Sequence, residues 1–346
     1  MEILWFCAVA FMLCMYVLLD GFDLGAGILH LSIARTNDER RTVLGAIGPF
    51  WDGNEVWLIA AGGTLYFAFP LLYASSFSGF YLPLTIVLWL LILRGLGIEM
   101  RHQVDHPMWR SFWDGTFSAG SSLLAIFLGA ALGNVVRGVP LGPDGYFFEP
   151  LWTSFTVQPA AGILDWFTVL LGLVGLTTLA AHGGNYVAMK TTGELQARAR
   201  ARARFWSWGV LFTSCAAAFS TSEIRPDIWR NFAEHEWGFI FPILGAAGLC
   251  GMFYFNRRSA DVKAFLSSCA FIVGMLSSTA FGLFPSVLPS STIPAYGLTV
   301  YNTAARSYGL GIGIAWWTVG IVVALGYFIY LFRSFRGKVH VTPEGY

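Results

Sequence analysis

The sequence predicts an all-α integral membrane protein with nine transmembrane helices. Of its 346 residues, 56% are hydrophobic and only 12% are charged, and the apolar residues form long blocks. Soluble domains carry about 25% charged residues. The blocks lack the alternation of membrane β-barrels, so helices are the spanning structure that remains.

Nine blocks are long enough to cross a bilayer, which takes about 20 residues. The first follows Met1 and Glu2 with neither a basic leader nor a cleavage site, which indicates a retained span and not a signal peptide. We place the spans near residues 3–32, 51–73, 76–100, 114–136, 161–186, 205–222, 237–255, 263–285 and 312–333.

The Lys and Arg residues predict the orientation of these spans. One set of loops is rich in them, whereas the opposite set carries only Arg137, Arg225, Arg230 and Arg306. Because basic loops stay in the cytoplasm, we expect the N-terminus outside and the C-terminus in the cytoplasm. A net charge of +1 gives no indication of a nucleic-acid partner.

The loop around 190–204 is the strongest shift in composition, and it divides the spans into four, four and one. A faint similarity between DGFD at 20–23 and HGGN at 182–185 is compatible with a duplicated four-helix unit. The outer stretches 137–160 and 286–311 are expected to lie against the membrane or a partner. We therefore expect two four-helix bundles, 1–158 and 159–285, and a segment 286–346 with an outer loop, a peripheral ninth helix and a cytoplasmic tail.

Ionisable side chains inside the spans gather in the cytoplasmic half. Asp20 and Asp23 lie three residues apart on one face of the first span. Gly21 and Gly25 form a small-xxx-small pair that predicts the close approach of another helix. Carboxylates within a membrane are costly, so each is a functional candidate, and a set converging from one side suits a proton path.

The second span opens with Asp52 and Glu55 between Trp51 and Trp57. These carboxylates either take part in proton uptake or form a capping pair for the free N–H groups of the helix. The sequence leaves both interpretations open.

Three more charged residues lie on the same side. Arg94 and Glu99 are in the inner part of the third span, and Asp114 opens the fourth. Arg94 either neutralises Glu99, extends to the cytoplasm or holds a carboxylate ionised. Asp114 is either a helix cap or part of the path. A relay through Asp20, Asp52 and Glu99 would have Asp52 nearest the aqueous entrance and Asp20 deepest.

Few side chains are suited to haem ligation. Of six histidines, only His30 and His182 lie near spans, so we expect no multi-haem centre within this chain alone. The HExxH, CxxCH, P-loop and GxGxxG motifs are absent from the sequence. Catalysis by the isolated chain is therefore not expected.

Several motifs resemble subunit II of cytochrome bd-type quinol oxidases. They are DGFDLGAG at 20–27, FWDGNEVWLIAAGG at 50–63, RGLGIE at 94–99, GNVVRGVP at 133–140 and FPSVLPSST at 284–292. The similarity covers nearly the whole chain in the same order, and WDGN[EQ]VW within a membrane helix is a specific signal.

The resemblance implies a bacterial inner-membrane complex that oxidises quinol and reduces O2 to water. Subunit I would carry two b-type haems, one haem d and the quinol site, and subunit II would support it and contribute proton access from the cytoplasm. Small accessory subunits, membrane lipid and a structural quinone are further candidate partners. The family's acidic proton-path positions fall on Asp20, Asp23, Asp52 and Glu99, and Glu55 stands where other members have Gln.

Two other functions fit part of the sequence. A proton-coupled secondary transporter would also show internal repeats and intramembrane carboxylates near broken helices. Here, however, the carboxylates lie mostly on one side instead of meeting at the midplane. A purely structural subunit is the second alternative.

Overall fold

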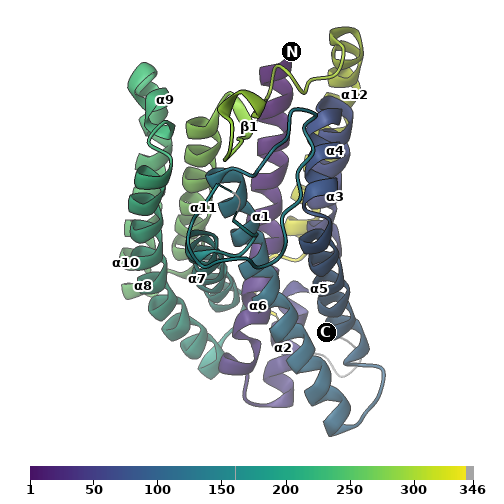
Figure 1. Ribbon diagram of the computed structural model, residues 1–346. Helices are drawn as coiled ribbons and strands as arrows, with labels where there is room; N and C mark the ends of the chain where they lie inside the picture. The colour runs from purple at the N-terminus through teal and green to yellow at the C-terminus, as the bar shows by residue number, and fades with distance from the viewer. Residues whose placement is uncertain (160, 340–346) are drawn as a thin grey trace.

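The computed structural model describes residues 1–159 and 161–339, and most of this part is helical (Figure 1). Two short strands, β1 (Ser286–Leu288) and β2 (Leu298–Thr299), form one antiparallel pair. The helices are α1 (Glu2–Ile33), α2 (Asn37–Ile47), α3 (Trp51–Ala68), α4 (Pro70–Gly79), α5 (Tyr81–Met100), α6 (Pro107–Arg137), α7 (Trp166–Lys190), α8 (Gly193–Ile224), α9 (Ile228–Glu234), η1 (Glu236–Phe239), α10 (Ile240–Arg257), α11 (Asp261–Leu283), η2 (Pro294–Tyr296) and α12 (Ser307–Ser334).

Seven of the described helices are long and apolar enough to cross a membrane: α1, α5, α6, α7, η1 with α10, α11 and α12. The expected spans at 51–73 and 205–222 correspond to α3 with α4 and to α8, which are outside this set. Their composition explains why. Helix α3 begins with Asp52, Asn54 and Glu55, and the part of α8 beyond Arg204 contains seven Ser, Thr and Glu residues.

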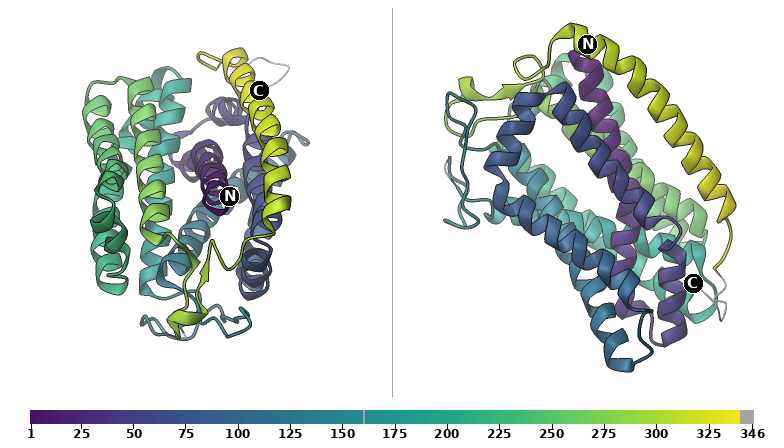
Figure 2. Two further views of the ribbon diagram at one scale, coloured as in Figure 1. Left: turned by 90° about the horizontal axis from the view of Figure 1, so that it is seen from above. Right: turned by 90° about the vertical axis from the view of Figure 1, so that its right-hand side faces the viewer.

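Helix α1 occupies the centre of the bundle and packs against α3, α6 and α7 (Figure 2). The contact with α7 is very close: a Cβ atom on Gly25 would lie 2.0 Å from the carbonyl oxygen of Leu179 and 2.7 Å from Cα of Gly183. The predicted approach of another helix at Gly21 and Gly25 is therefore confirmed, and α7 is that helix. Any side chain at Gly25 would separate the two helices.

The second expected span is broken. We predicted one helix over 51–73, but the structure ends α3 at Ala68 and starts α4 at Pro70. Phe69 has φ −134° and ψ 64°, outside the helical region. Proline has no N–H and forces the preceding residue out of the α conformation, so the interruption has a local cause.

The expected loop at 190–204 is also different. Only Thr191 and Thr192 lie outside helices, and α8 begins at Gly193. Alanine and arginine are strong helix formers. Leu195, Ala199 and Ala203 recur every four residues and are buried, so the basic segment forms the amphipathic first part of helix α8.

The two ends of the bundle differ. The Met1 end holds the irregular segments 138–165 and 284–306, and the α2 end holds α2 and the start of α8 (Figure 1). Within the described residues the two segments pair with each other: the Val139 N–H donates to Pro289 O and the Ser291 N–H donates to Val139 O. These outer stretches therefore cover one another, which the sequence did not indicate.

Helix α12 lies at the periphery (Figure 2). Only 6% of its most apolar window is buried within the chain, against 56% for α7. Its exposed side chains include Trp316, Val322 and Tyr330. Such a face requires lipid or another protein around it.

Candidate functional site

A buried polar cluster lies where α1, α3 and α5 meet. Asp20 and Asp23 come from the middle of α1, Asn54 and Glu55 from the first turns of α3, and Arg94 from the last two turns of α5. Asp20, Asp23, Asn54 and Arg94 are all 0% exposed. We call these five residues the Arg94 cluster.

Arg94 joins two helices to its own. Its Nη1 donates to Oδ1 of Asp20 at 2.5 Å, and its Nη2 donates to Oε1 of Glu55 at 2.6 Å. The side chain of Glu55 is 24% exposed, whereas those of Asp20 and Arg94 are fully buried. Glu55 therefore connects the buried pair to the protein surface.

Asn54 holds the second carboxylate of α1. Its Nδ2 donates to Oδ2 of Asp23 at 2.7 Å and to the carbonyl oxygen of Leu19 at 3.3 Å. The second contact brings the start of α3 beside the middle of α1. Because α1 continues for ten residues beyond Asp23, this cluster lies well inside the bundle and not at its edge.

The cluster has polar capacity that the described protein atoms do not use. Oδ2 of Asp20, Oδ1 of Asp23, Oδ1 of Asn54 and Nε of Arg94 are buried and have no hydrogen-bond partner there. Buried polar atoms of this kind normally bind ordered water or exchange protons with neighbours. The cluster also contains three carboxyl groups for one guanidinium. Burial of two uncompensated negative charges is costly, so charge balance favours protons on some of these carboxyl groups.

The structure brings together only part of the predicted relay. Asp20, Asp23 and Glu55 share the cluster, whereas Asp52 and Glu99 are exposed and form no ion pair in the part of the chain that the structure describes. Of the interpretations left open for Arg94, the pair with Glu99 is wrong, because Arg94 binds Asp20 and Glu55 instead.

Of the two interpretations left open for Asp52 and Glu55, the capping pair at the start of α3 is wrong. The N-cap residue is Phe50, and no side chain caps this helix. Trp51 is half-buried and Trp57 is buried, where its ring packs 5.5 Å from that of Phe328. The two tryptophans therefore act in packing around the cluster.

Asp114 is not a helix cap either, since α6 starts seven residues earlier with His106 as N-cap and Pro107 as first residue. Its carboxylate is the centre of a second buried network nearer the α2 end. It accepts hydrogen bonds from Nε2 of His30 at 2.7 Å, Nε of Arg101 at 2.6 Å and Nη1 of Arg40 at 2.8 Å. One carboxylate thus joins α1, α2, α6 and the end of α5.

Sequence reasoning missed Asn54 and the partners of Asp114. A signal for Asn54 was available, because Asn54, Trp57 and Ala61 recur at spacings of three and four and form the buried face of α3. The partners of Asp114 are up to 84 residues away in the chain, and no local pattern indicates them.

Both histidines near the spans use Nε2 within the protein. His30 contacts Asp114, and His182 contacts the carbonyl oxygen of Leu18 at 3.0 Å. The other nitrogen of His182 is 2.7 Å from Oγ of Ser268. Neither imidazole therefore presents a free Nε2 for haem iron, and the described residues contain no group of three or more metal-ligating side chains.

A third buried cluster lies at the Met1 end. Arg137, the last residue of α6, donates to Asn134 at 2.8 Å, to Glu149 at 2.8 Å and to Asp165, the N-cap of α7. Burial raises the pKa of Glu149 to about 7, Arg137 opposes that shift, and Asp165 adds to it. This cluster fixes the 138–165 segment to the ends of two helices.

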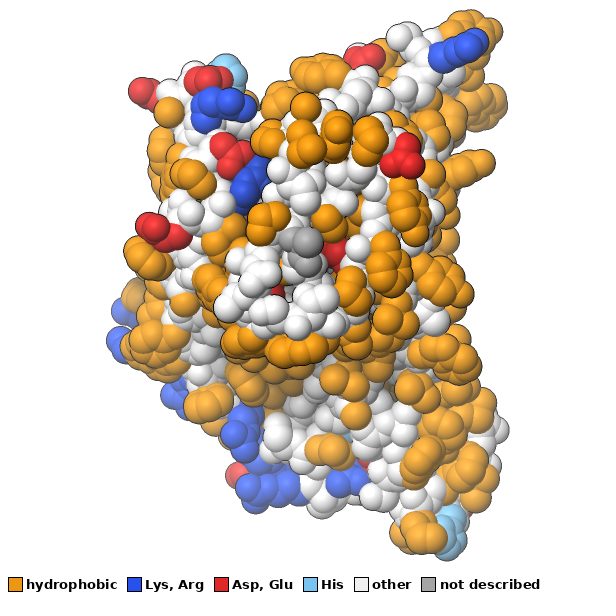
Figure 3. All heavy atoms as spheres, viewed as in Figure 1, with side chains coloured by type: hydrophobic (Ala, Val, Ile, Leu, Met, Phe, Trp, Pro, Cys, Tyr) orange, Lys and Arg blue, Asp and Glu red, His pale blue; other side chains and the backbone are white. Residues whose placement is uncertain are grey.

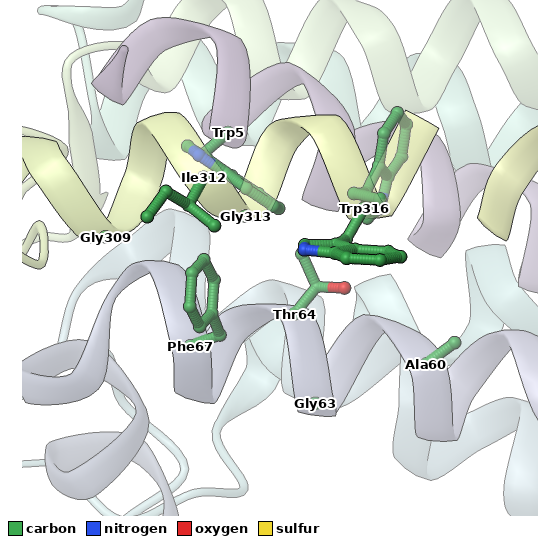
Figure 4. Close-up of a pocket in the computed structure, with 10 residues that line it drawn as sticks. Trp5, Ala60, Gly63, Thr64, Phe67, Gly309, Ile312, Gly313 and Trp316 are labelled. Atoms are coloured by element: carbon green, nitrogen blue, oxygen red, sulfur yellow. The ribbon is translucent and has the colours of Figure 1, made fainter. Parts of the chain in front are cut away.

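An open groove runs between α1, α3 and α12, with a volume of about 560 Å³ (Figure 4). It is lined by the aromatic rings of Trp5, Phe67 and Trp316, and Thr64 supplies a hydroxyl group. A Cβ atom on Gly63 would meet no atom within 4 Å, so this side of α3 leaves open space. The groove suits a flat or extended apolar molecule.

Residues 1–335 match the family described as cytochrome bd terminal oxidase subunit II. The chain is 33% identical to "Probable cytochrome oxidase subunit 2" of Haemophilus influenzae, over 98% of this chain and 95% of that protein. It is 33% identical to "Cytochrome bd ubiquinol oxidase subunit 2" of Bacillus subtilis, over 99% and 98% of the two chains.

Two further proteins are similar. "Cytochrome bd-I ubiquinol oxidase subunit 2" of Escherichia coli K12 is 30% identical over 94% of this chain and 91% of its own length. A chain in "The structure of bd oxidase from Geobacillus thermodenitrificans" shares the fold with a TM-score of 0.72 and 14% identity, covering 96% of this chain and 98% of the other.

Proposed function

The chain belongs to the cytochrome bd terminal oxidase subunit II family, and from this premise we propose that the Arg94 cluster delivers protons for the reduction of O2. As a member, it is one subunit of a haem-containing oxidoreductase complex and a multi-pass protein of the bacterial inner membrane. A haem-bearing subunit I is its partner, and quinol and O2 are the substrates of the complex.

We place the α2 end of the bundle in the cytoplasm. The basic residues gather at that end, and the positive-inside rule then puts Met1 outside. In this arrangement α3 with α4 and α8 also cross the membrane, which makes nine spans in two bundles, with α12 as the peripheral ninth. Reporters fused at Gly142 and Arg336 test it: the first should report the outside and the second the cytoplasm.

One observation carries the proton proposal: a single guanidinium joins a fully buried carboxyl group to a partly exposed one. A carboxyl group at Glu55 exchanges protons with water, and Arg94 binds Glu55 through one terminal nitrogen and Asp20 through the other, so that one guanidinium holds both carboxyl groups. Asn54 keeps Asp23 beside them. Because the cluster has more carboxyl groups than cations, some of these groups carry a proton that can be passed on. The low dielectric of the buried site favours the protonated, neutral form.

The remaining predicted positions have narrower roles in this proposal. Asp52 is exposed at the start of α3, three residues before Glu55, where it attracts protons from water to the entrance of the path. Glu99 is exposed at the end of α5 and has the same role. Both act at the surface and neither is a required carrier.

In this proposal the haem cofactors belong to the partner subunit. We assign two b-type haems and one haem d to subunit I, since the two imidazoles buried in this chain already use Nε2 internally. For a structural quinone, the groove along Thr64 and Trp316 is the place that fits: its rings suit a quinone head and its apolar wall suits an isoprenoid tail. Small accessory subunits would have the exposed face of α12 available.

The proposal is tested by Glu55→Gln in the purified two-subunit complex, reconstituted in liposomes. We expect normal haem content, slower O2 consumption and slower proton uptake from the cytoplasmic side, because the exchangeable proton at the surface of the cluster is removed. Glu99→Gln is the matched control and should slow both rates less than Glu55→Gln does, because Glu99 lies at the surface and is not a required carrier. Equal rates in wild type and Glu55→Gln would leave the cluster with a structural role only.

A further inference from the structure

A group of basic side chains at the α2 end has no role in the proton path. It consists of Arg202 and Arg204 on α8, Arg257 and Arg258 at the end of α10, and Lys263 on α11, and all five are exposed. We call it the α8–α10 basic rim. Figure 3 shows Lys and Arg side chains gathered along the lower left edge of the molecule, where α8 and α10 lie.

The rim has no counter-ion within the part of the chain that the structure describes. Neighbouring arginines differ in this respect, because Arg198 pairs with Glu39 and Arg200 pairs with Asp261. Both oxygens of Asp261, the nearest acidic side chain along α11, accept from Arg200 at 2.7 Å. The basic rim therefore carries positive charges without counter-ions in the described residues, next to the arginines Arg198 and Arg200, which have them.

A groove with an apolar floor leads to the rim. It is lined by a stripe along α10, at spacings of three and four residues: Cys250, Phe253, Tyr254, Arg257 and Arg258. The guanidinium of Arg258 lies 4.6 Å from the ring centre of Tyr254, and this contact orients it over the groove. The end of the groove at Cys250 and Phe253 is thus apolar, and the end at Arg257 and Arg258 is cationic.

The neighbouring helix extends the apolar part. Trp208 of α8 packs 4.8 Å from Phe253, ring centre to ring centre, and remains about half exposed. Phe205 and Phe212, one turn to either side on the same helix, are more exposed still. A continuous strip of aromatic side chains therefore lies on the hydrocarbon side of the basic rim.

The rim lies at the depth of lipid headgroups. The apolar helix that ends at Arg257 starts at Glu236 and contains 22 residues. At 1.5 Å per residue this is about 33 Å, close to the hydrocarbon thickness of a bilayer. Arg257 and Arg258 are thus where the phosphate groups of one leaflet are found.

We propose that the rim and groove bind one anionic phospholipid, with its phosphate between Arg257 and Arg258 and an acyl chain along Phe253 and Trp208. Guanidinium groups bind phosphate through paired N–H donors. Five unmatched cations favour a lipid with net negative charge over a zwitterionic one. The site is independent of the proton path and of the direction in which the chain spans the membrane.

The test uses the complex of this chain with its partner subunit, delipidated in mild detergent and titrated with phosphatidylglycerol or phosphatidylcholine. Bound lipid is counted by native mass spectrometry. We expect one tightly bound phosphatidylglycerol and much weaker binding of phosphatidylcholine. The double variant Arg257→Gln/Arg258→Gln should weaken phosphatidylglycerol binding at least about tenfold, because two charge-assisted hydrogen bonds are lost.

The control variant Arg333→Gln/Arg336→Gln removes the same charge from the end of α12, where both side chains are exposed. It should leave the affinity unchanged. Equal weakening in both variants would show diffuse charge attraction and overturn the site. Equal binding of the two lipids would also overturn the site. Loss of the partner subunit from the Arg257→Gln/Arg258→Gln complex, with lipid binding intact, would overturn it too and would make this face a protein interface.

Discussion

Asp20→Asn separates the proton role that we propose for the Arg94 cluster from its structural role. The substitution keeps the size of the side chain and one acceptor oxygen for Nη1 of Arg94, and it removes the carboxyl proton. Glu55 still pairs with Arg94, so the guanidinium keeps a counter-charge. The structural cost is one hydrogen bond between two charged groups changed to a hydrogen bond between a cation and a neutral amide, about 1 kcal/mol.

This cost is below the about 3–5 kcal/mol expected when a buried charge loses its only partner. We therefore expect Asp20→Asn to assemble with subunit I and to contain normal haem. Turnover should fall at least about tenfold, because positioned acid–base groups contribute about 10²–10⁴-fold to proton-transfer steps. The assay is O2 uptake at saturating quinol, normalised to haem, from pH 5.5 to 8.5.

Asp52→Asn is the matched control, with the same change on an exposed residue that caps no helix. Its stability should stay within about 0.5 kcal/mol of wild type, and its turnover should fall less than that of Asp20→Asn. Unchanged turnover of Asp20→Asn at every pH would refute the relay. Loss of haem from that variant alone would instead make the carboxylate structural.

Three predictions concern the other clusters and the packing of α1. The pKa of Glu149 is raised from 4.5 to about 7, which means that the folded state binds the carboxyl proton more tightly than the unfolded state does. The free energy of unfolding should therefore fall by about 3 kcal/mol as the pH rises from 4.5 to 7. Glu149→Gln should remove this pH dependence, measured by thermal denaturation of the complex at pH 5 and pH 8. Gly25→Val should lower the yield of assembled complex, since its side chain would overlap a carbonyl oxygen of α7, whereas Gly62→Ala, which meets no atom within 4 Å, should be neutral. Asp114→Asn should destabilise the chain by about 3–5 kcal/mol, measured by chemical denaturation, against about 0–1 kcal/mol for Arg110→Gln, whose partner is exposed.

Local patterns predicted the seven helices that are long and apolar enough to cross a membrane and the close contact of α1, because composition and small-residue spacing act within one segment. One of the interpretations left open for Arg94, the pair with Glu99, fails for a geometric reason. Residues five apart differ by about 140° around a helix, so Arg94 and Glu99 point to different faces. Asp114 was placed at a helix start although His106 and Pro107 give an earlier signal, since proline is favoured in the first turn.

The sequence alone could not predict which buried charged residues pair with one another across helices. Arg94 binds an aspartate 74 residues away, and the Asp114 network joins residues from four helices. These contacts depend on how each helix is rotated about its axis and which helices are neighbours. Packing of whole faces decides both, so no single segment contains the information.

The charge balance of the two buried networks distinguishes their roles. Asp114 is one carboxylate among two guanidiniums and an imidazole, so it stays ionised and serves as a fixed anchor for α2 and α6. The Arg94 cluster is the reverse, with three carboxyl groups around one guanidinium and two of them fully buried. A network with excess cations has no proton to give at neutral pH, whereas one with excess carboxyl groups holds protons that can be exchanged. The same residue types therefore form an anchor near the α2 end and, about 10 Å further along α1, the cluster that we propose passes protons toward subunit I.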